Sequence, residues 1–157
     1  DNIFCNDRSL SSGDGFSLSN WIIYNPYKRL INVKTPSLIC SQTVDKFTTS
    51  SALGNGKLTY PVGLINADEV YLAGGKHLNN NNRYYLYTGE AYWTGSPSFF
   101  YSSGGNAYAW NIHSTGYLDV HPVTDFYHVR PVLNLSSNIL ISSGSGTYNN
   151  PYQIKLN

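Results

Sequence analysis

The most regular pattern of apolar and polar positions lies between residues 107 and 121. Apolar and polar residues alternate there on both sides of a Ser-Thr-Gly turn at 114–116. A period of two is typical of strands with one buried face, so this segment is predicted to form a β-hairpin. The apolar set is expected to face the core: Tyr108, Trp110, Ile112, Leu118 and Val120. The other set is expected to face outwards as one chemically mixed surface: Asn111, His113, Tyr117, Asp119 and His121.

Other segments after residue 92 also have the character of short strands. Runs rich in tyrosine, tryptophan and valine are separated by turn signals, Gly-Ser-Pro at 95–97 and Ser-Gly-Gly at 103–105. The run 129–135 is apolar at nearly every position, which predicts an interior strand with Arg130 either paired inside or reaching the edge. Pro131 is expected at a bulge or at a strand end.

Two helix starts are indicated in the first half of the chain. Asn66 can cap a helix with Glu69 three residues later, as in a capping box, and Gly74 supplies a left-handed stop. Asp68 and Glu69 lie in the first turn, where capping and the helix dipole account for both carboxylates. A second start is predicted at Asn25-Pro26, with asparagine as the cap and proline at the first helical position.

Composition narrows the class of protein. The chain has 157 residues, of which 15% are aromatic and 12% are charged. The aromatic content argues against disorder, and no apolar run approaches the roughly 18 residues of a membrane span. A net charge of +1 from scattered basic residues provides no patch for polyanions, so neither nucleic acid binding nor direct membrane insertion is expected. We expect one domain over 1–157, the mature part of a longer exported precursor, because no signal segment begins at Asp1.

The two cysteines, Cys5 and Cys40, are far apart in sequence and have no CxxC spacing. This spacing disfavours zinc and thioredoxin-like sites and favours a single disulfide. The alternative is a pair of buried free thiols, which behave as small apolar side chains in intracellular proteins.

Catalytic and metal-binding arrangements are weakly supported. Imidazole and carboxylate ligands suit zinc, and His113, His121 and His128 lie close in sequence to Asp119 and Asp125, but histidines without an established ligand spacing are more often surface residues. No Gly-x-Ser-x-Gly elbow is present to hold a nucleophilic serine. We therefore expect no enzyme activity, no cofactor and no metal.

The run of four asparagines at 79–82 could offer carbonyl oxygens to calcium. It has no neighbouring carboxylates, however, and hard cations usually require charged ligands. The run is therefore predicted to be a solvated loop.

The polar composition is that of a binding surface. Tyrosine and tryptophan give large contact area at little entropic cost, and asparagine, serine and glycine give adaptable hydrogen bonds, as in antibody paratopes. Four aromatic residues are expected to fill the core: Trp21, Trp93, Tyr108 and Trp110. The segment Phe99–Asn106 is expected to be an exposed loop. The candidate ligand-binding residues are Tyr101, Asn106, Asn111, His113, Tyr117, Asp119, His121, Asp125 and Tyr127.

Several segments carry a resemblance to known proteins: Phe4–Arg8, Pro36–Cys40, Tyr60–Val70, Ala73–Gly75, Tyr92–Pro97, Ala109-Trp110, Val129–Leu133, Ser143–Thr147 and Asn150–Tyr152. The series covers most of the chain and resembles a family of secreted or surface proteins of Gram-positive gut bacteria. The order of its later segments also looks like the formylglycine-generating-enzyme branch of the C-type lectin fold, which includes variable ligand-binding proteins diversified by retroelements.

The resemblance implies a C-type-lectin-like α+β domain with a small antiparallel sheet, one or two short helices and much irregular chain. The enzymes of that branch use paired cysteines with copper late in the chain. Cys5 and Cys40 do not match those positions, so the oxidase activity does not transfer and the two thiols look structural.

We therefore expect a non-catalytic recognition or adhesion module, extracellular or on the bacterial surface. It would bind a protein or carbohydrate on another cell or on a host surface through the outward face of the hairpin and adjacent loops. The alternative is the globular head of a pilin-like, self-assembling surface fibre.

Overall fold

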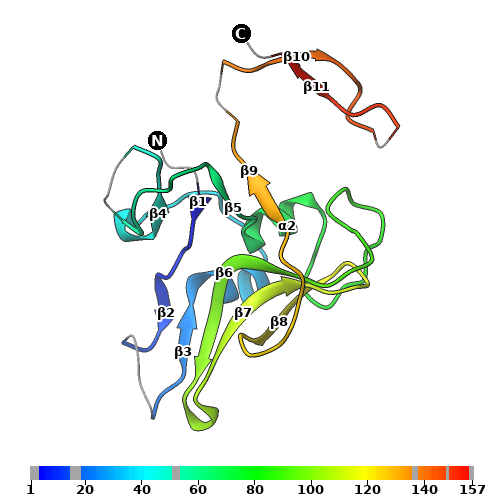
Figure 1. Cartoon of the computed structure of the whole chain (residues 1–157). Helices are drawn as coiled ribbons and strands as arrows, with labels where there is room; N and C mark the ends of the chain where they lie inside the picture. Colours follow the sequence, from blue (N-terminus) through cyan, green and yellow to red (C-terminus); the bar gives the residue numbers. More distant parts are fainter. Residues whose placement is uncertain (1–3, 15–18, 51–53, 136–137, 148, 156–157) are drawn as a thin grey trace.

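The computed structural model describes residues 4–14, 19–50, 54–135, 138–147 and 149–155, and its largest element is a five-stranded antiparallel sheet (Figure 1). The strand order in space is β2-β3-β6-β7-β8. The bounds of these strands are β2 Leu10–Ser12, β3 Ile22–Tyr24, β6 Tyr92–Tyr101, β7 Asn106–Ile112 and β8 Leu118–Pro122.

Within the described residues, three two-stranded antiparallel ladders accompany this sheet. They pair β1 Phe4–Cys5 with β4 Lys46–Phe47, β5 Val62–Leu64 with β9 Pro131–Leu133, and β10 Leu140–Ser143 with β11 Gln153–Lys155. Single 3₁₀ turns occur at η2 Thr43–Asp45 and η3 Ser102–Gly104. The described part of the chain also has two short helices, so its fold is mixed α+β and mostly strand, which confirms the expected class.

The second helix, α2 Ala67–Ala73, confirms the capping-box prediction. The Asn66 side chain accepts a hydrogen bond from the Glu69 backbone N–H at 2.8 Å, and the Glu69 carboxylate accepts from the Asn66 N–H at 2.9 Å. Gly74 ends the helix with a φ of 123°, a conformation that L side chains rarely adopt. Capping explains Glu69, but it does not explain Asp68, whose carboxylate is buried against another element.

The first helix begins where Asn25-Pro26 predicted, but with a different cap. Tyr24 is the N-cap residue, and α1 Asn25–Tyr27 continues as a π-helix, η1 Lys28–Val33. The Asn25 amide instead donates to the Ser9 hydroxyl at 2.8 Å, which ties the helix start to the N-terminal segment.

The hydrophobic core lies between the two helices and the inner face of β6, β7 and β8. Trp110, Ile112 and Leu118 have no exposed surface, so the predicted inward set of the hairpin is confirmed at its centre. Val120 packs half-buried against the same cluster. The fully or largely buried members are Leu30, Ile65, Ala67, Val70, Tyr84, Tyr92, Trp110, Ile112 and Leu118.

Strand β6 is longer than its sequence suggested. It runs without a break through the Gly-Ser-Pro signal at 95–97 and includes Phe99, which was expected in an exposed loop. The ladder to β7 shifts register between Trp93 and Pro97 and again between Pro97 and Phe99. Such irregularities accommodate a proline inside a sheet, because the regular ladder of hydrogen bonds, to which proline cannot donate, is already interrupted on either side of it.

Two of the four tryptophan and tyrosine residues expected in the core lie elsewhere. Trp21 is 51% exposed and stacks on Phe99, with ring centroids 5.5 Å apart. Trp93 is half-buried on the outer face of the sheet. Tyr108 is half-buried and stacks on Phe99 at 4.3 Å, so only Trp110 is completely enclosed.

The apolar run 129–135 is not an interior strand. It contributes β9, which pairs only with the short β5 and is mostly exposed. Pro131 is the first residue of this strand, as predicted for a proline at a strand end. Arg130 donates to the Leu86 carbonyl at 3.2 Å and lies 4.8 Å from the centre of the Tyr92 ring.

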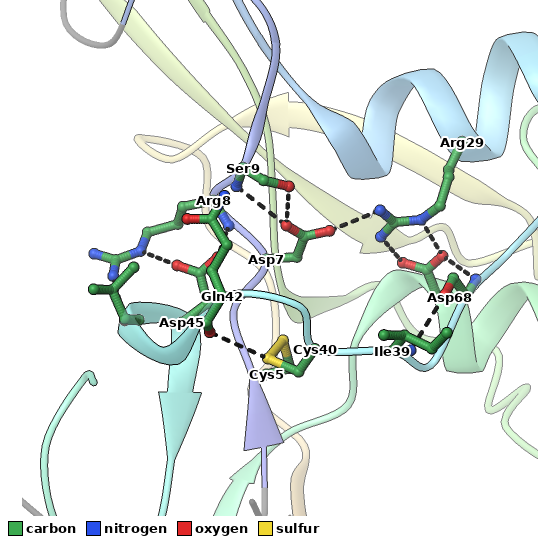
Figure 2. The surroundings of a disulfide bond; sticks show 12 residues. Cys5, Asp7, Arg8, Ser9, Arg29, Ile39, Cys40, Gln42, Asp45 and Asp68 are labelled. Carbon is green, nitrogen blue, oxygen red and sulfur yellow. Dashed lines mark hydrogen bonds and ion pairs between the residues drawn. A yellow bond between two sulfur atoms is a disulfide. The ribbon is translucent and has the colours of Figure 1, made fainter. Parts of the chain in front are cut away.

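Cys5 and Cys40 form a disulfide, which confirms the predicted pairing over the alternative of free thiols (Figure 2). Beside it, the Arg29 guanidinium contacts Asp68 at 2.8 and 2.9 Å and Asp7 at 2.7 Å (Figure 2). Burial alone would lower the pKa of Arg29, but the hydrogen bonds and charges of Asp68 and Asp7 outweigh it and raise that pKa above its usual value.

A second buried carboxylate lies on the other side of the disulfide. Asp45 is almost fully buried and accepts hydrogen bonds from the Arg8 side chain at 2.9 Å and from the Arg8 backbone N–H at 3.0 Å (Figure 2). Together with the disulfide, the two ion-pair groups attach the N-terminal segment to α2 and to the turn at Thr43–Asp45.

Candidate functional site

The outer face of the β7–β8 hairpin carries a polar cluster centred on His121. The register pairs Asn111 with Asp119 and Ala109 with His121, so the polar residues of both strands share this face. The Trp93 side chain joins them from β6, whose residue 93 pairs with Asn111. The inner face of the same strands is the core, so the predicted separation of two faces is correct.

Each nitrogen of the His121 ring contacts a carboxylate. Nε2 lies 3.2 Å from Asp119 Oδ2, and Nδ1 lies 2.9 Å from Asp125 Oδ2. The Tyr127 hydroxyl is 3.0 Å from the same Nδ1. His121 is therefore held at both ends, and the segment that follows β8 folds back over the outer face of the sheet.

The Tyr127 ring connects this segment to the sheet. It makes edge contacts with Trp93 at 4.9 Å and with His121 at 5.2 Å between ring centroids. Burial, reinforced by the negative charges of Asp125 and Asp119, raises the pKa of the Tyr127 hydroxyl. The phenol therefore stays protonated through the neutral and mildly alkaline range, where it can donate a hydrogen bond.

His113 and Tyr117 form the end of the cluster at the hairpin turn. Their rings are stacked, with centroids 4.5 Å apart and an angle of 16° between the planes. Burial and the neighbouring Asp119 carboxylate raise the pKa of Tyr117. Both side chains are half-buried, so each keeps a surface that a ligand can contact.

Asn111 is the clearest error of the outward set, because it has no exposed surface. Tyr127 and the segment around it cover this part of the outer face, and neither polar atom of the Asn111 amide makes a well-aligned hydrogen bond within the described residues. The amide is close enough to the Tyr127 phenol to oppose the rise in its pKa. Asn111 therefore lies beneath the cluster and has no exposed surface with which to contact a ligand.

Tyr101 and Asn106 lie away from the cluster. They pair with each other at the β6–β7 turn, which is the opposite end of β7 from His113. At about 3.4 Å per residue, the length of β7 separates the two ends by about 20 Å. Tyr101 instead packs edge-on against Trp21 at 4.6 Å. The structure thus joins seven of the nine predicted residues in one cluster and excludes these two.

The asparagine run at 79–82 belongs to the same region, which was not predicted. It lies in the loop between α2 and β6, beside the β7–β8 turn (Figure 1). The Thr115 hydroxyl donates to Asn80 Oδ1 at 2.7 Å and lies 3.0 Å from His113 Nδ1. The Asn81 N–H donates to the Thr115 carbonyl at 3.2 Å. The run is a largely exposed loop, as expected, but its contacts with the turn were not predicted.

Close approach at this contact requires a glycine in the turn. Gly116 has a φ of 87°, and a Cβ added there would lie 1.8 Å from the Asn81 carbonyl oxygen. Beside the contact is a hollow of about 300 Å³ lined by Asn80, Asn82, Tyr87 and Thr115. An aromatic ring with amide and hydroxyl groups is a combination suited to polar ligands with flat apolar faces.

An exposed phenylalanine stands at the edge of the cluster. Phe126, between Asp125 and Tyr127, is 100% exposed. An apolar cleft of about 500 Å³ follows β6 and β7, with Pro97, Ala109 and Val123 among its lining residues. Alternation could not identify Phe126, because it lies after the end of β8, where the period of two stops.

The arrangement provides hydrogen-bond donors and acceptors with aromatic surfaces. In the part of the chain that the structure describes, no three His, Cys, Asp or Glu side chains are placed to hold a metal ion together. Within the same residues, no helix is long and apolar enough to cross a bilayer. Comparisons with protein-family models, with curated proteins and with solved structures found no match.

Proposed function

We propose that this chain is a non-catalytic recognition module that binds a protein or glycan through the outer face of the β7–β8 hairpin. The observation that carries the proposal is the convergence of three separate segments on one accessible surface. Thr115 of the hairpin contacts Asn80 at 2.7 Å, and His121 contacts Asp125 at 2.9 Å. A fixed arrangement of polar and aromatic groups lowers the entropic cost of binding.

The chemistry of this surface suits the two ligand classes. Tyrosine, histidine and asparagine supply stacking and hydrogen bonds to sugar hydroxyls or to a peptide backbone. A fully exposed phenylalanine is typical of a position that becomes buried when a partner binds.

The proposal includes a C-type-lectin-like fold and an extracellular or cell-surface location in a Gram-positive bacterium, with retroelement diversification of the binding face. The α+β class and the small antiparallel sheets support the fold assignment. The disulfide supports an oxidising compartment.

A binding screen against glycans and host-surface proteins tests this function. Any hit should be lost in the double variant His113→Ala/Tyr117→Ala and weakened in Phe126→Ala. The melting temperature should stay within a few degrees for all variants, because Phe126 is fully exposed and the half-buried His113 and Tyr117 lie outside the hydrophobic core.

Tyr152→Ala is the matched control for the loss of an exposed aromatic ring. Tyr152 is also exposed, but it lies next to β11 in the C-terminal hairpin. If this variant loses binding as strongly as Phe126→Ala, or if the double variant keeps full affinity, the assignment of the site is wrong.

A second function, the head of a pilin-like surface fibre, is favoured by the C-terminal hairpin. Strands β10 and β11 form an isolated pair that stands apart from the five-stranded sheet (Figure 1). Ile141 and Ile154 are paired in its register, and both are exposed. Two-stranded hairpins are marginally stable alone, so a neighbouring copy would stabilise this one.

Light scattering on the full chain separates the two functions. Self-assembly predicts oligomers that become monomers in Ile141→Asp/Ile154→Asp, because two buried charges would oppose the contact. If the wild-type chain remains monomeric at high concentration, that result contradicts self-assembly, and ligand recognition is then the remaining function.

A further inference from the structure

A third cavity, distinct from the hairpin face, lies where the first helix meets the loop after α2. Its volume is about 560 Å³, within the range of small-molecule sites. Leu30, Ile31, Tyr71 and Leu78 form an apolar wall. It has no lining residue in common with the His121 cluster or with the hollow beside Asn80.

The polar side of this cavity is cationic. Lys34 comes from the end of the first helix and Lys76 from the loop, and none of the lining residues is acidic. Among the described residues, neither lysine takes part in an ion pair. Two ammonium groups without carboxylate partners leave their charge available to an anionic ligand.

His77 and Asn79 add neutral hydrogen-bonding groups to the lining. Burial lowers the pKa of His77, which lies edge-on to Trp110 at 5.8 Å, while the Asp119 charge opposes the shift. The imidazole is therefore neutral at neutral pH and can serve sugar hydroxyls as donor or acceptor.

The backbone around the cavity is held in uncommon conformations. Lys34 has a φ of 59° and Leu78 a φ of 51°, and they are the two non-glycine residues with positive φ in the described parts of the chain. Both line this cavity, as do two residues of the π-helix Lys28–Val33. Strained residues and π-helical turns are concentrated at ligand sites in proteins, where the strained backbone holds binding groups in place before the ligand arrives.

We propose that this cavity binds an acidic sugar. The sugar carboxylate would lie between Lys34 and Lys76, and the sugar ring would lie against the apolar wall that includes Tyr71. This is an additional site, so its failure would leave the proposed recognition function of the hairpin face untouched.

Titration of the full chain with D-glucuronate and with D-glucose tests the proposal, because the two sugars differ in one carboxylate. Calorimetry at low ionic strength should show glucuronate binding at least about tenfold more tightly, the effect of one charge-assisted hydrogen bond. Lys76→Ala should weaken glucuronate binding roughly tenfold, whereas Lys28→Ala, a lysine of the first helix that does not line the cavity, should not.

Lys34→Gly separates binding from folding. Glycine relieves the left-handed conformation, so the variant should be at least as stable as the wild type while its glucuronate affinity falls. Equal binding of the two sugars, no binding of glucuronate, or equal losses in Lys28→Ala and Lys76→Ala would overturn the proposal. Sulfate that competes as strongly as glucuronate would show that charge alone is recognised, and it would refute the sugar site.

Discussion

Replacing Arg29 by alanine is expected to lower the free energy of unfolding by about 3 to 5 kcal/mol. The Asp68 side chain is 4% exposed and makes its ion pair with this guanidinium, which also contacts Asp7 at 2.7 Å. Without Arg29, the Asp68 carboxylate keeps only the Ser37 N–H donor at 2.8 Å among its described hydrogen bonds. An uncompensated buried charge is costly, and urea denaturation followed by circular dichroism measures the loss.

Arg83→Ala is the control for removing an arginine. The Arg83 residue is exposed, and its described hydrogen bond is made by its backbone N–H, so its free energy of unfolding should change by less than about 0.5 kcal/mol. A loss below about 1 kcal/mol in Arg29→Ala would contradict the central place of this ion-pair network in holding the N-terminal segment to α2.

Removing the disulfide with Cys5→Ser/Cys40→Ser is expected to cost about 3 to 4 kcal/mol. The bond joins residues 35 apart in sequence, and the chain entropy of an unfolded loop of that length accounts for the magnitude. Guanidinium denaturation of the double variant and of the reduced wild type should give matching midpoints.

Alkylation with mass measurement provides the accompanying check on the disulfide. The unreduced chain should take up no label when unfolded, and the reduced chain should take up two. Labelling without reductant, or equal stability of the oxidised and reduced chains, would refute the disulfide's role.

Features that depend on local spacing were predictable from sequence. The capping box of Asn66 and Glu69 needs only a separation of three residues, and the inward set of the hairpin needs only a period of two. Asp68 shows where local reasoning stops. Its buried pairing with Arg29, 39 residues earlier, is a tertiary contact without a local signal.

The candidate site was predicted only in part, because it too depends on tertiary contacts that have no local signal in the sequence. Alternation divides a hairpin into two faces, but it does not show what covers the outer one. The segment carrying Asp125 and Tyr127 folds back over that face, so Asn111 is buried although its position in the pattern is correct. Composition alone assigned Tyr101 to the site, and the length of β7 places it at the far end.

The missed loop contact and the strand error also have physical causes. The asparagine run is largely exposed, as expected, but a single sequence does not show that Gly116 permits the close approach of Asn81 to the turn. The Gly-Ser-Pro signal did not end β6, because register shifts absorb Pro97 within a continuous strand. In both cases the tertiary partner, and not the local residue type, decides the conformation.

A two-dimensional ¹⁵N–¹H NMR titration tests the central claim most directly. The probe is the strongest hit of the glycan and protein screen, added to the full chain. If the outer face of the β7–β8 hairpin is the binding surface, the shifted amides should be concentrated in 80–82 and 113–127. Shifts confined to the β6–β7 turn at 101–106 or to the C-terminal hairpin at 140–155, with 113–127 unchanged, would contradict it.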